Sequence, residues 1–386
     1  MSLSYRKRYV LAALESSYGV DATPTQTIMC GDITIKPLVG ESVERKRVQA
    51  AFGGTGKIRI KNYVTLSFTT EFTGAGTAGT APPWAILAKA CGFTETLTAA
   101  AITGTAQVGG STTSIKLAAG ASAVDDFYVG MPIAITAGTG NGQKGRIIDY
   151  NGTSKVATIA VPWAVAPIAD STYSIGANAL YIPHSNASGS NTSASLYFGV
   201  DGVRHILLGA RGNMKINQSS GALETITWEF TGLLGVISDQ SNPVADYSAW
   251  QIPVTTSTEN TGDINLLGYA NPVLSEFSVD IGNVVTYRNP VNSEAVLITD
   301  RKVMGNFRIE ATTVATKDWW TFAKNAQYGP ICLRHGTTAG NVVGVVGPNV
   351  QLQDPDYADS DNIAELVGSL EYVPVVGNDE IRIFVN

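Results

Sequence analysis

One glycine pattern in the sequence has the spacing of a cofactor site. Gly140, Gly142 and Gly145 match G-x-G-x-x-G, in which the glycines let the backbone approach a pyrophosphate. Both flanking segments, PIAIT and RIIDY, have the residue types of strands, and no helix follows whose N-terminus could face the phosphate. The pattern therefore predicts a hairpin turn, and we expect the protein to bind no cofactor.

A second stretch, GGTGK ending at Lys57, resembles part of a phosphate-binding loop. Ala51 stands where that loop has its first glycine, and Ile58 stands where it has the hydroxyl residue that holds magnesium. Because both positions depart from the motif, we expect no nucleotide site here.

Acidic residues gather in DPDYADSD, residues 354–361, where several carboxylates could bind calcium weakly. The segment lacks the glycine and the closing glutamate of an EF-hand loop, so we expect a solvated loop between strands. His184, His205 and His335 have no ligand spacing. No G-x-S-x-G motif is present, and only a Ser-His-Asp set assembled from distant positions stays open. We therefore expect neither a metal site nor an enzyme.

The composition is typical of a soluble β protein. The 386 residues include 40 glycines, and only 15% are charged, which favours short strands with frequent turns. A net charge of −6 argues against a protein that grips nucleic acid by neutralising phosphates. Three widely spaced cysteines indicate neither a disulfide framework nor a zinc site, and no segment approaches a membrane span.

The elements that would position these residues occur twice. A strand at 57–72 is followed by a helix at 82–92, and a strand at 304–314 is followed by a helix at 317–329. Both helices contain Trp-x-x-x-Ala-Lys, and each unit has a charged segment before it and a closing strand pair after it. The charged segments are 39–54 and 287–303. We predict a mainly β fold with two tandem β-sandwich modules, each flanked by a short α-helix.

A tract of alternating segments and Gly-rich turns interrupts the first unit and predicts a small all-β insert domain at 105–175. The first module then comprises 1–104 and 176–245, including an N-terminal arm at 1–28, and the second comprises 246–386. The aromatic residues of the two helices could stack on bases or sugars. We expect Trp84, Trp319 and Phe322 to fill the core between sheet and helix instead.

Four blocks of the chain carry a family resemblance: YVLAALESSYGVDATPT, GDITIKPLVGESVERKRV, KIRIKNYVTLSFTTEFTGAGTAGTAPPWAILAKACGF and YFGVDGVRHILLGARGNMKINQSSGALETITWEFTGLLG. They resemble the major tail tube protein of long, non-contractile-tailed bacteriophages. The resemblance implies a structural virion protein that polymerises as stacked rings into the tail tube, the conduit for genome ejection. It also implies a location in the virion tail, and in the host cytoplasm during assembly.

The partners that the resemblance implies are further copies of the chain, the tape measure protein, the tail terminator and distal tail proteins, with genomic DNA passing through the lumen without specific binding and no membrane contact. The resemblance implies six tube modules in each ring, so two modules per chain would give a homotrimer with pseudo-hexameric rings. An open sheet needs neighbours to cover its edges, and ring closure would supply them. Because acidic residues outnumber basic ones, we expect a net negative channel wall.

The resemblance also implies roles for individual residues. It places inter-subunit and inter-ring contacts at Glu41, Glu44, Arg45, Lys46, Arg47, Arg288, Glu294, Asp300, Arg301 and Lys302. It places the N-terminal arm, without a core of its own, around Arg6, Lys7, Arg8 and Tyr9. Two alternatives stay open: a β-sandwich receptor- or carbohydrate-binding protein of a virion or cell surface and, less favoured, a hydrolase.

Overall fold

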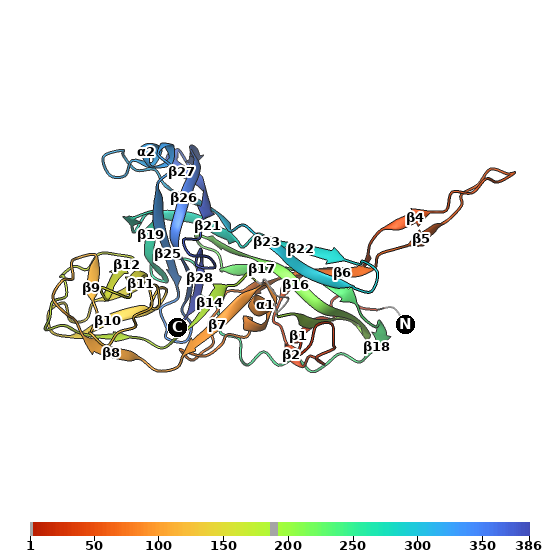
Figure 1. Cartoon of the computed structure of the whole chain (residues 1–386), viewed down its shortest axis with the longest axis horizontal. Coiled ribbons are helices and arrows are strands. Elements are labelled where there is room, and N and C mark those ends of the chain that lie inside the picture. Colours follow the sequence, from red (N-terminus) through yellow and green to blue (C-terminus); the bar gives the residue numbers. More distant parts are fainter. Residues whose placement is uncertain (1–2, 186–191) are drawn as a thin grey trace.

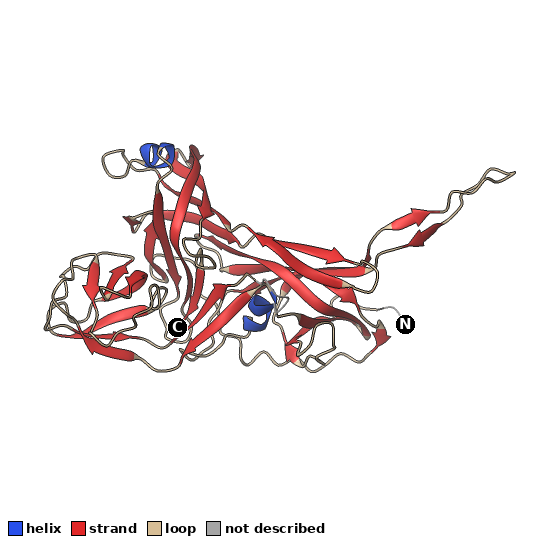
Figure 2. Ribbon diagram, viewed as in Figure 1, coloured by secondary structure: helices blue, strands red, loops and turns tan. Residues whose placement is uncertain are grey.

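The computed structural model of the chain describes residues 3–185 and 192–386. Within these residues the protein is mainly β, with twenty-eight strands and two short helices, as the sequence predicts (Figure 2). The molecule is elongated, with a separate small sheet at one end and a long hairpin projecting from the other (Figure 1). No helix in the described part of the chain is both long and apolar enough to cross a membrane.

Four antiparallel strands form the first set, in the order β3-β6-β17-β16. Their bounds are β3 Gly31–Val39, β6 Tyr63–Glu71, β17 Thr225–Leu234 and β16 Val203–Ser219. Buried and less buried residues alternate along β6 and β17, so that Phe68, Trp228 and Phe230 enter the core. Most of the Thr and Ser residues face the other way, whereas Thr70 is buried and accepts a hydrogen bond from the Trp228 indole at 2.9 Å. The period of two therefore gives this sheet one buried face and one open face.

The N-terminal half of β16 continues into a second layer, which contains strands near the beginning of the chain. It pairs with β15 (Ala194–Val200), which pairs with β1 (Arg8–Leu14); β1 pairs with β2 (Gln26–Thr27), and β18 (Ser238–Asp239) pairs with β16. The expectation of an arm without a core of its own is therefore wrong for β1, because its apolar run is buried in this sheet.

The second set repeats the order of the first, as β21-β24-β27-β26. Its strands are β21 Leu274–Asp280, β24 Met304–Glu310, β27 Ile363–Tyr372 and β26 Val343–Ser360, and its second layer adds β25 Tyr328–His335, β19 Thr261–Leu266 and β20 Tyr269–Ala270. The solvated loop expected at 354–361 is wrong for 354–360, which are the end of β26, because pairing with β27 supplies the backbone bonds of Asp356–Ser360. Asp361 lies in the turn that leads to β27.

In each set one short helix follows the second strand along the chain, at the place where the sequence predicts a longer one. Helix α1 spans Ala85–Ala90 and helix α2 spans Trp319–Lys324. Two prolines precede α1, and Gly92 ends it with a positive φ of 83°, which a glycine adopts without strain. The carboxylate of Asp318 caps α2 by accepting a bond of 2.9 Å from the backbone N–H of Thr321.

The small sheet is six-stranded, and its strands run from 102 to 175, close to the insert expected at 105–175. They are β8 Ile102–Thr105, β9 Ser114–Lys116, β10 Pro132–Ala137, β11 Lys144–Asn151, β12 Val156–Ile159 and β13 Thr172–Ile175. The glycine pattern lies in the turn between β10 and β11, where Gly140 and Gly142 have positive φ, so the hairpin prediction is confirmed there.

The stem of this insert is fused to the second set. Strands β7 (Phe93–Thr98) and β14 (Asn178–Pro183) pair with each other, and β14 also pairs with β28 (Arg382–Val385), which pairs with β26. The insert core includes Leu180, Cys332 and Phe384 from outside its own sheet. Arg146 places its guanidinium 3.7 Å from the centre of the Phe384 ring. The insert is thus packed onto the second set rather than tethered to it.

Two hairpins complete the fold, and each connects the first two strands of one set. Strands β4 (Ser42–Glu44) and β5 (Lys57–Arg59) lie between β3 and β6, and strands β22 (Asn283–Arg288) and β23 (Ala295–Arg301) lie between β21 and β24. Both expected charged segments, 39–54 and 287–303, therefore belong to hairpins that occupy matching positions in the chain order.

Candidate assembly surfaces

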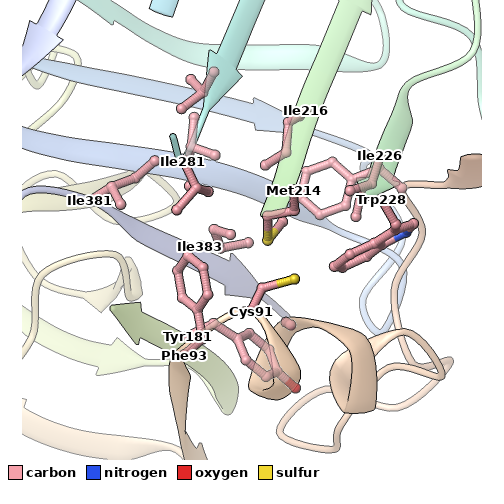
Figure 3. Packing of buried hydrophobic residues seen from close by; sticks show 14 of the residues in the cluster. Cys91, Phe93, Tyr181, Met214, Ile216, Ile226, Trp228, Ile281, Ile381 and Ile383 are labelled. Carbon is pink, nitrogen blue, oxygen red and sulfur yellow. The ribbon is translucent and has the colours of Figure 1, made fainter. Parts of the chain in front are cut away.

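The two four-strand sets join edge to edge inside the chain. The end of β16 pairs antiparallel with β21, from Lys215 opposite Asp280 to Ser219 opposite Glu276. Beneath this seam, Met214, Ile216 and Ile281 point into the same buried cluster (Figure 3). The backbone N–H of Ile281 donates to the carbonyl of Met214 at 3.1 Å, one residue beyond the ladder. The seam produces one continuous sheet of both sets, with β3 and β26 at its two ends.

Both ends of this sheet are open within the described residues. There β3 pairs with β6 alone, and the segment Asp356–Ser360 of β26 pairs with β27 alone. Lys36 and Asp356 are exposed on these edges, and Tyr357 is 57% exposed. Unpaired strand edges associate readily with other strands. The molecule therefore has two open edges of one sheet, each suited to pairing with another chain.

The hairpin β22–β23 lies along the first set and contacts it through specific bonds (Figure 1). The Nη1 of Arg211 donates to the carbonyl of Val296 at 2.7 Å, and the rings of Tyr63 and Tyr287 stack with centroids 4.8 Å apart. The side-chain amide of Asn283 donates to the carbonyls of Cys91 at 2.7 Å and Gly212 at 3.0 Å. This hairpin thus anchors one set onto the other.

Three of the contact residues expected on β22–β23 are bonded within the chain. Arg301 Nε lies 2.6 Å from a carboxylate oxygen of Glu380, Lys302 Nζ lies 3.1 Å from Glu371, and Glu294 accepts a hydrogen bond from a tyrosine hydroxyl. The Arg301 pair is almost entirely buried. Arg288 and Asp300 are exposed. Most of the charge on this hairpin therefore serves contacts inside one chain.

The hairpin β4–β5 differs, because it projects from the body of the molecule (Figure 1). Residues 41–54 are all exposed, and they include Glu41, Glu44, Arg45, Lys46 and Arg47. Lys61 pairs with Glu41 at 2.9 Å at the base of the hairpin. Val48 and Phe52 near its tip are completely exposed. These apolar residues make the tip of the hairpin a candidate contact surface.

The expected N-terminal arm comprises Arg6, Lys7, Arg8 and Tyr9. Lys7 Nζ lies 3.1 Å from Asp201, and Arg8 donates from Nη1 to the carbonyl of Ile33 on β3 at 3.0 Å. Tyr9 is 7% exposed, while Arg6 is exposed. These residues tie the start of the chain to its own first set.

The two helices turn their tryptophans inward. Trp84 and Trp319 are buried, and their indole N–H groups donate to the carbonyl of Thr73 at 2.8 Å and to the hydroxyl of Thr312 at 2.9 Å. Phe322 is 8% exposed. Because these rings lie inside the core, their faces are not available for stacking on a base or a sugar.

The open face of the continuous sheet is polar and mainly acidic. Its rows of directly opposite residues include Thr34, Ser67, Glu229 and Asn213. The acidic side chains on this face include Glu71, Glu229, Glu276, Asp280, Glu310, Asp356, Glu365 and Glu371, and the basic ones include Lys36, Arg211, Lys215 and Arg308. Acidic residues therefore outnumber basic ones on this face.

The junction of the two sets contains a buried acid that no pattern in the sequence indicates. Glu224 lies in the turn between β16 and β17 and is 2% exposed. Burial raises the pKa of its carboxyl group well above the ordinary range, and burial lowers the pKa of the neighbouring His335. The only signal in the sequence was a glutamate in a short turn, which by itself is typical of a solvated residue.

The surfaces described comprise two open strand edges, one projecting hairpin and one polar sheet face. Within residues 3–185 and 192–386, no cluster of three or more His, Cys, Asp or Glu side chains could hold a metal ion. Comparison with known protein families gives no match, and comparison with curated proteins gives none either.

Proposed function

We propose that the protein is a structural virion protein whose copies close into rings and stack into the tail tube of a long, non-contractile-tailed bacteriophage. One observation carries the proposal: two four-strand sets already pair edge to edge within the chain, while the two outer edges of the same sheet are open. An interface between unlike edges generates rings when the rotation closes. Repeating the internal seam between chains would produce such a ring.

Ring size follows from the number of strands. Three chains contribute six sets and twenty-four strands, which at a spacing of about 4.8 Å and a tilt of about 40° enclose a barrel about 50 Å across between backbones. Six chains would enclose one about 100 Å across by the same reasoning. The narrower barrel fits a channel that surrounds a single DNA duplex, so we favour three chains per ring.

The projecting hairpin supports the same arrangement. Hairpin β22–β23 crosses from the second set onto the first set of its own chain, and β4–β5 occupies the matching position in the first set. In a ring, β4–β5 would have the second set of the next chain, or the next ring, to lie on. The acidic, Thr-rich open face would then line the lumen, where it would repel DNA phosphates instead of binding them.

Electron microscopy of the purified protein in negative stain tests the proposal. We expect rings or hollow tubes, and native mass spectrometry of isolated rings should give three chains. Dispersed monomers that bind glycans would contradict the proposal and favour a receptor- or carbohydrate-binding protein. In the virion, the ends of the tube would contact the tape measure, tail terminator and distal tail proteins.

A further inference from the structure

Positions in the two four-strand sets can be matched through the residues that lie opposite each other in adjacent strands. The second strands share Phe-x-x-Glu, with Phe68 and Glu71 in β6 and Phe307 and Glu310 in β24. Each glutamate lies opposite the matching position of the third strand, since Glu71 faces Thr225 and Glu310 faces Glu365. This shared row provides a common origin from which positions on the other strands can be matched.

The match places Lys36 at the position of Asp280. Thr65 in β6 corresponds to Met304 in β24, since each lies six residues before its glutamate. Lys36 lies opposite Thr65, and Asp280 lies opposite Met304. The first strand of the second set thus carries an aspartate where the first strand of the first set carries a lysine.

The fourth strands are matched in the same way. Lys215 lies opposite Thr227 in the first set, and Asp356 lies opposite Val367 in the second. Thr227 and Val367 correspond, because each is two residues beyond the shared row. Asp356 therefore stands at the position of Lys215, so this pair of positions also carries opposite charges in the two sets.

We propose that β26 of one copy pairs antiparallel with β3 of a second copy in the register that sets Asp356 opposite Lys36. This inference rests on the proposed function and specifies its interface. Inside the chain, the internal seam sets Lys215 opposite Asp280. Between chains the same two positions again carry one lysine and one aspartate, with the charges exchanged. Opposite charges directly across an antiparallel pair stabilise it.

The exchange of charges selects the correct edges. If β26 of one chain took the place of β16 beside β21, Asp356 would lie opposite Asp280. If β16 paired with β3 of another chain, Lys215 would lie opposite Lys36. Like charges directly opposite destabilise a strand pair, and such repulsion is a common basis of specificity between similar interfaces. The internal seam and the seam between chains are thus kept distinct although their strands have the same order.

Two prolines bound the ladder at the same end. In the proposed register Pro37 lies opposite Pro355, directly after the pair of Lys36 and Asp356. Proline has no N–H to donate, so a ladder stops where it meets one. The internal seam also ends its strand pairing at this row, with Lys215 opposite Asp280. At the other end, Asp32 has a φ of 47° and the pairing of β3 with β6 is irregular between Gly31 and Thr34. The four residues 356–359 and the four residues 33–36 can therefore form the seam.

The apolar residues of both edges occupy the buried face in this register. Tyr357 would lie opposite Ile35. The corresponding residues in the internal seam are Ile216 and Val279, which lie opposite each other and are both buried. The Tyr357 ring already lies 5.1 Å from the Trp320 ring, on the side of the sheet that α2 covers. A slip of one residue would set a residue of the buried face of one strand opposite a residue of the open face of the other, so burial and charge specify the same register.

Charge reversal tests the pairing on the full chain. Lys36→Asp and Asp356→Lys should each reduce assembly at least tenfold, measured as the protein concentration at which half of the chains sediment as multimers. The double variant K36D/D356K should restore wild-type assembly. Both residues are exposed, and circular dichroism checks that each variant is folded. Failure of the double variant to assemble better than the single ones would overturn the proposed register.

Cross-linking measures the register directly. Thr34→Cys combined with Ala358→Cys places two thiols opposite each other, within disulfide reach, and Cys30→Ser removes the half-buried native thiol. We expect covalent multimers under mild oxidation, and few from the control pair Thr34→Cys and Ser360→Cys. Tubes that cross-link only through the control pair would refute the register and leave the proposed function intact. Cross-linked open chains without rings would support the register and refute the tube, and wild-type monomers would refute both.

Discussion

Nδ1 of His335 lies 3.6 Å from Oε1 of Glu224, at the buried junction between the two sets. The distance suits an ion pair, but burial raises the pKa of Glu224 and lowers the pKa of His335. We assign both groups as uncharged, because neither carboxyl oxygen of Glu224 has a hydrogen bond among the described residues and both residues are almost fully buried. The junction is therefore sensitive to the ionisation of this one acid.

Glu224→Gln should stabilise the protein increasingly as the pH rises above about 4.5, the ordinary pKa of glutamate. Since the raised pKa belongs to the folded state, the wild type loses stability as the pH rises toward that value, at up to about 1.4 kcal/mol per unit, while the variant does not. Urea unfolding between pH 4 and pH 8 measures the difference. Glu229→Gln, at an exposed residue, is the control. If the free energy of unfolding changed with pH equally in both variants, the assignment of Glu224 as uncharged would be contradicted.

Trp84→Ala should lower the free energy of unfolding by about 3–5 kcal/mol, because it empties a completely buried site beneath α1 and leaves the Thr73 carbonyl without its donor. Phe52→Ala is the matched change, since that ring is completely exposed. It should leave the unfolding of the monomer unchanged. Denaturant titration of both variants checks the contrast, which a similar loss in each would contradict.

Replacing Arg45, Lys46 and Arg47 by Glu should shorten or abolish tubes while the monomer keeps its stability, because all three residues lie on the exposed hairpin and make complementary contacts only in an assembly. Tube length in negative stain and the melting temperature are the measurements. Lys144→Glu, exposed on the insert, provides the control. Tubes of unchanged length in the triple variant would show that the hairpin β4–β5 does not lie in the assembly interface.

Replacing residues 105–175 by a short Gly-Ser bridge should still give tubes, because the stem strands β7 and β14 pair and bring the two cut ends together. The deletion should also lower the melting temperature, since it uncovers Cys332, Val346 and Phe384. Microscopy and thermal unfolding test both parts. A folded deletion variant that cannot assemble would place the insert in an interface between chains.

Lysines on the open face should make the channel retain DNA. Thr69→Lys and Thr227→Lys lie directly opposite each other on β6 and β17. Tubes of this double variant should bind duplex DNA at low salt and release it as the salt concentration rises, whereas wild-type tubes should bind little. A filter-binding titration measures retention, with Thr112→Lys on the exposed surface of the insert as the control. Equal retention by wild-type and variant tubes would exclude this face from the lumen.

Several features of the protein were determined by the sequence alone, because they depend on neighbouring residues. The run at 57–72 predicts a strand, of which Tyr63–Glu71 forms β6; the repeated Trp-x-x-x-Ala-Lys predicts two helices, and the glycines at 140–145 predict a turn. In each case the residues that decide the structure lie within a few positions of one another, so a local pattern is sufficient.

Other features were decided only by the tertiary structure. Residues 354–361 resemble a solvated loop in composition, yet pairing with β27 makes 354–360 part of a strand. The two hairpins are similarly charged, but β22–β23 has the first set of its own chain beneath it and β4–β5 does not. Lys215 faces Asp280 in the internal seam, whereas at the open edges the aspartate is on β26 and the lysine is on β3. This exchange of charges depends on which strands are neighbours. Strand neighbours are chosen by contacts far apart in the chain, and no local pattern contains that information.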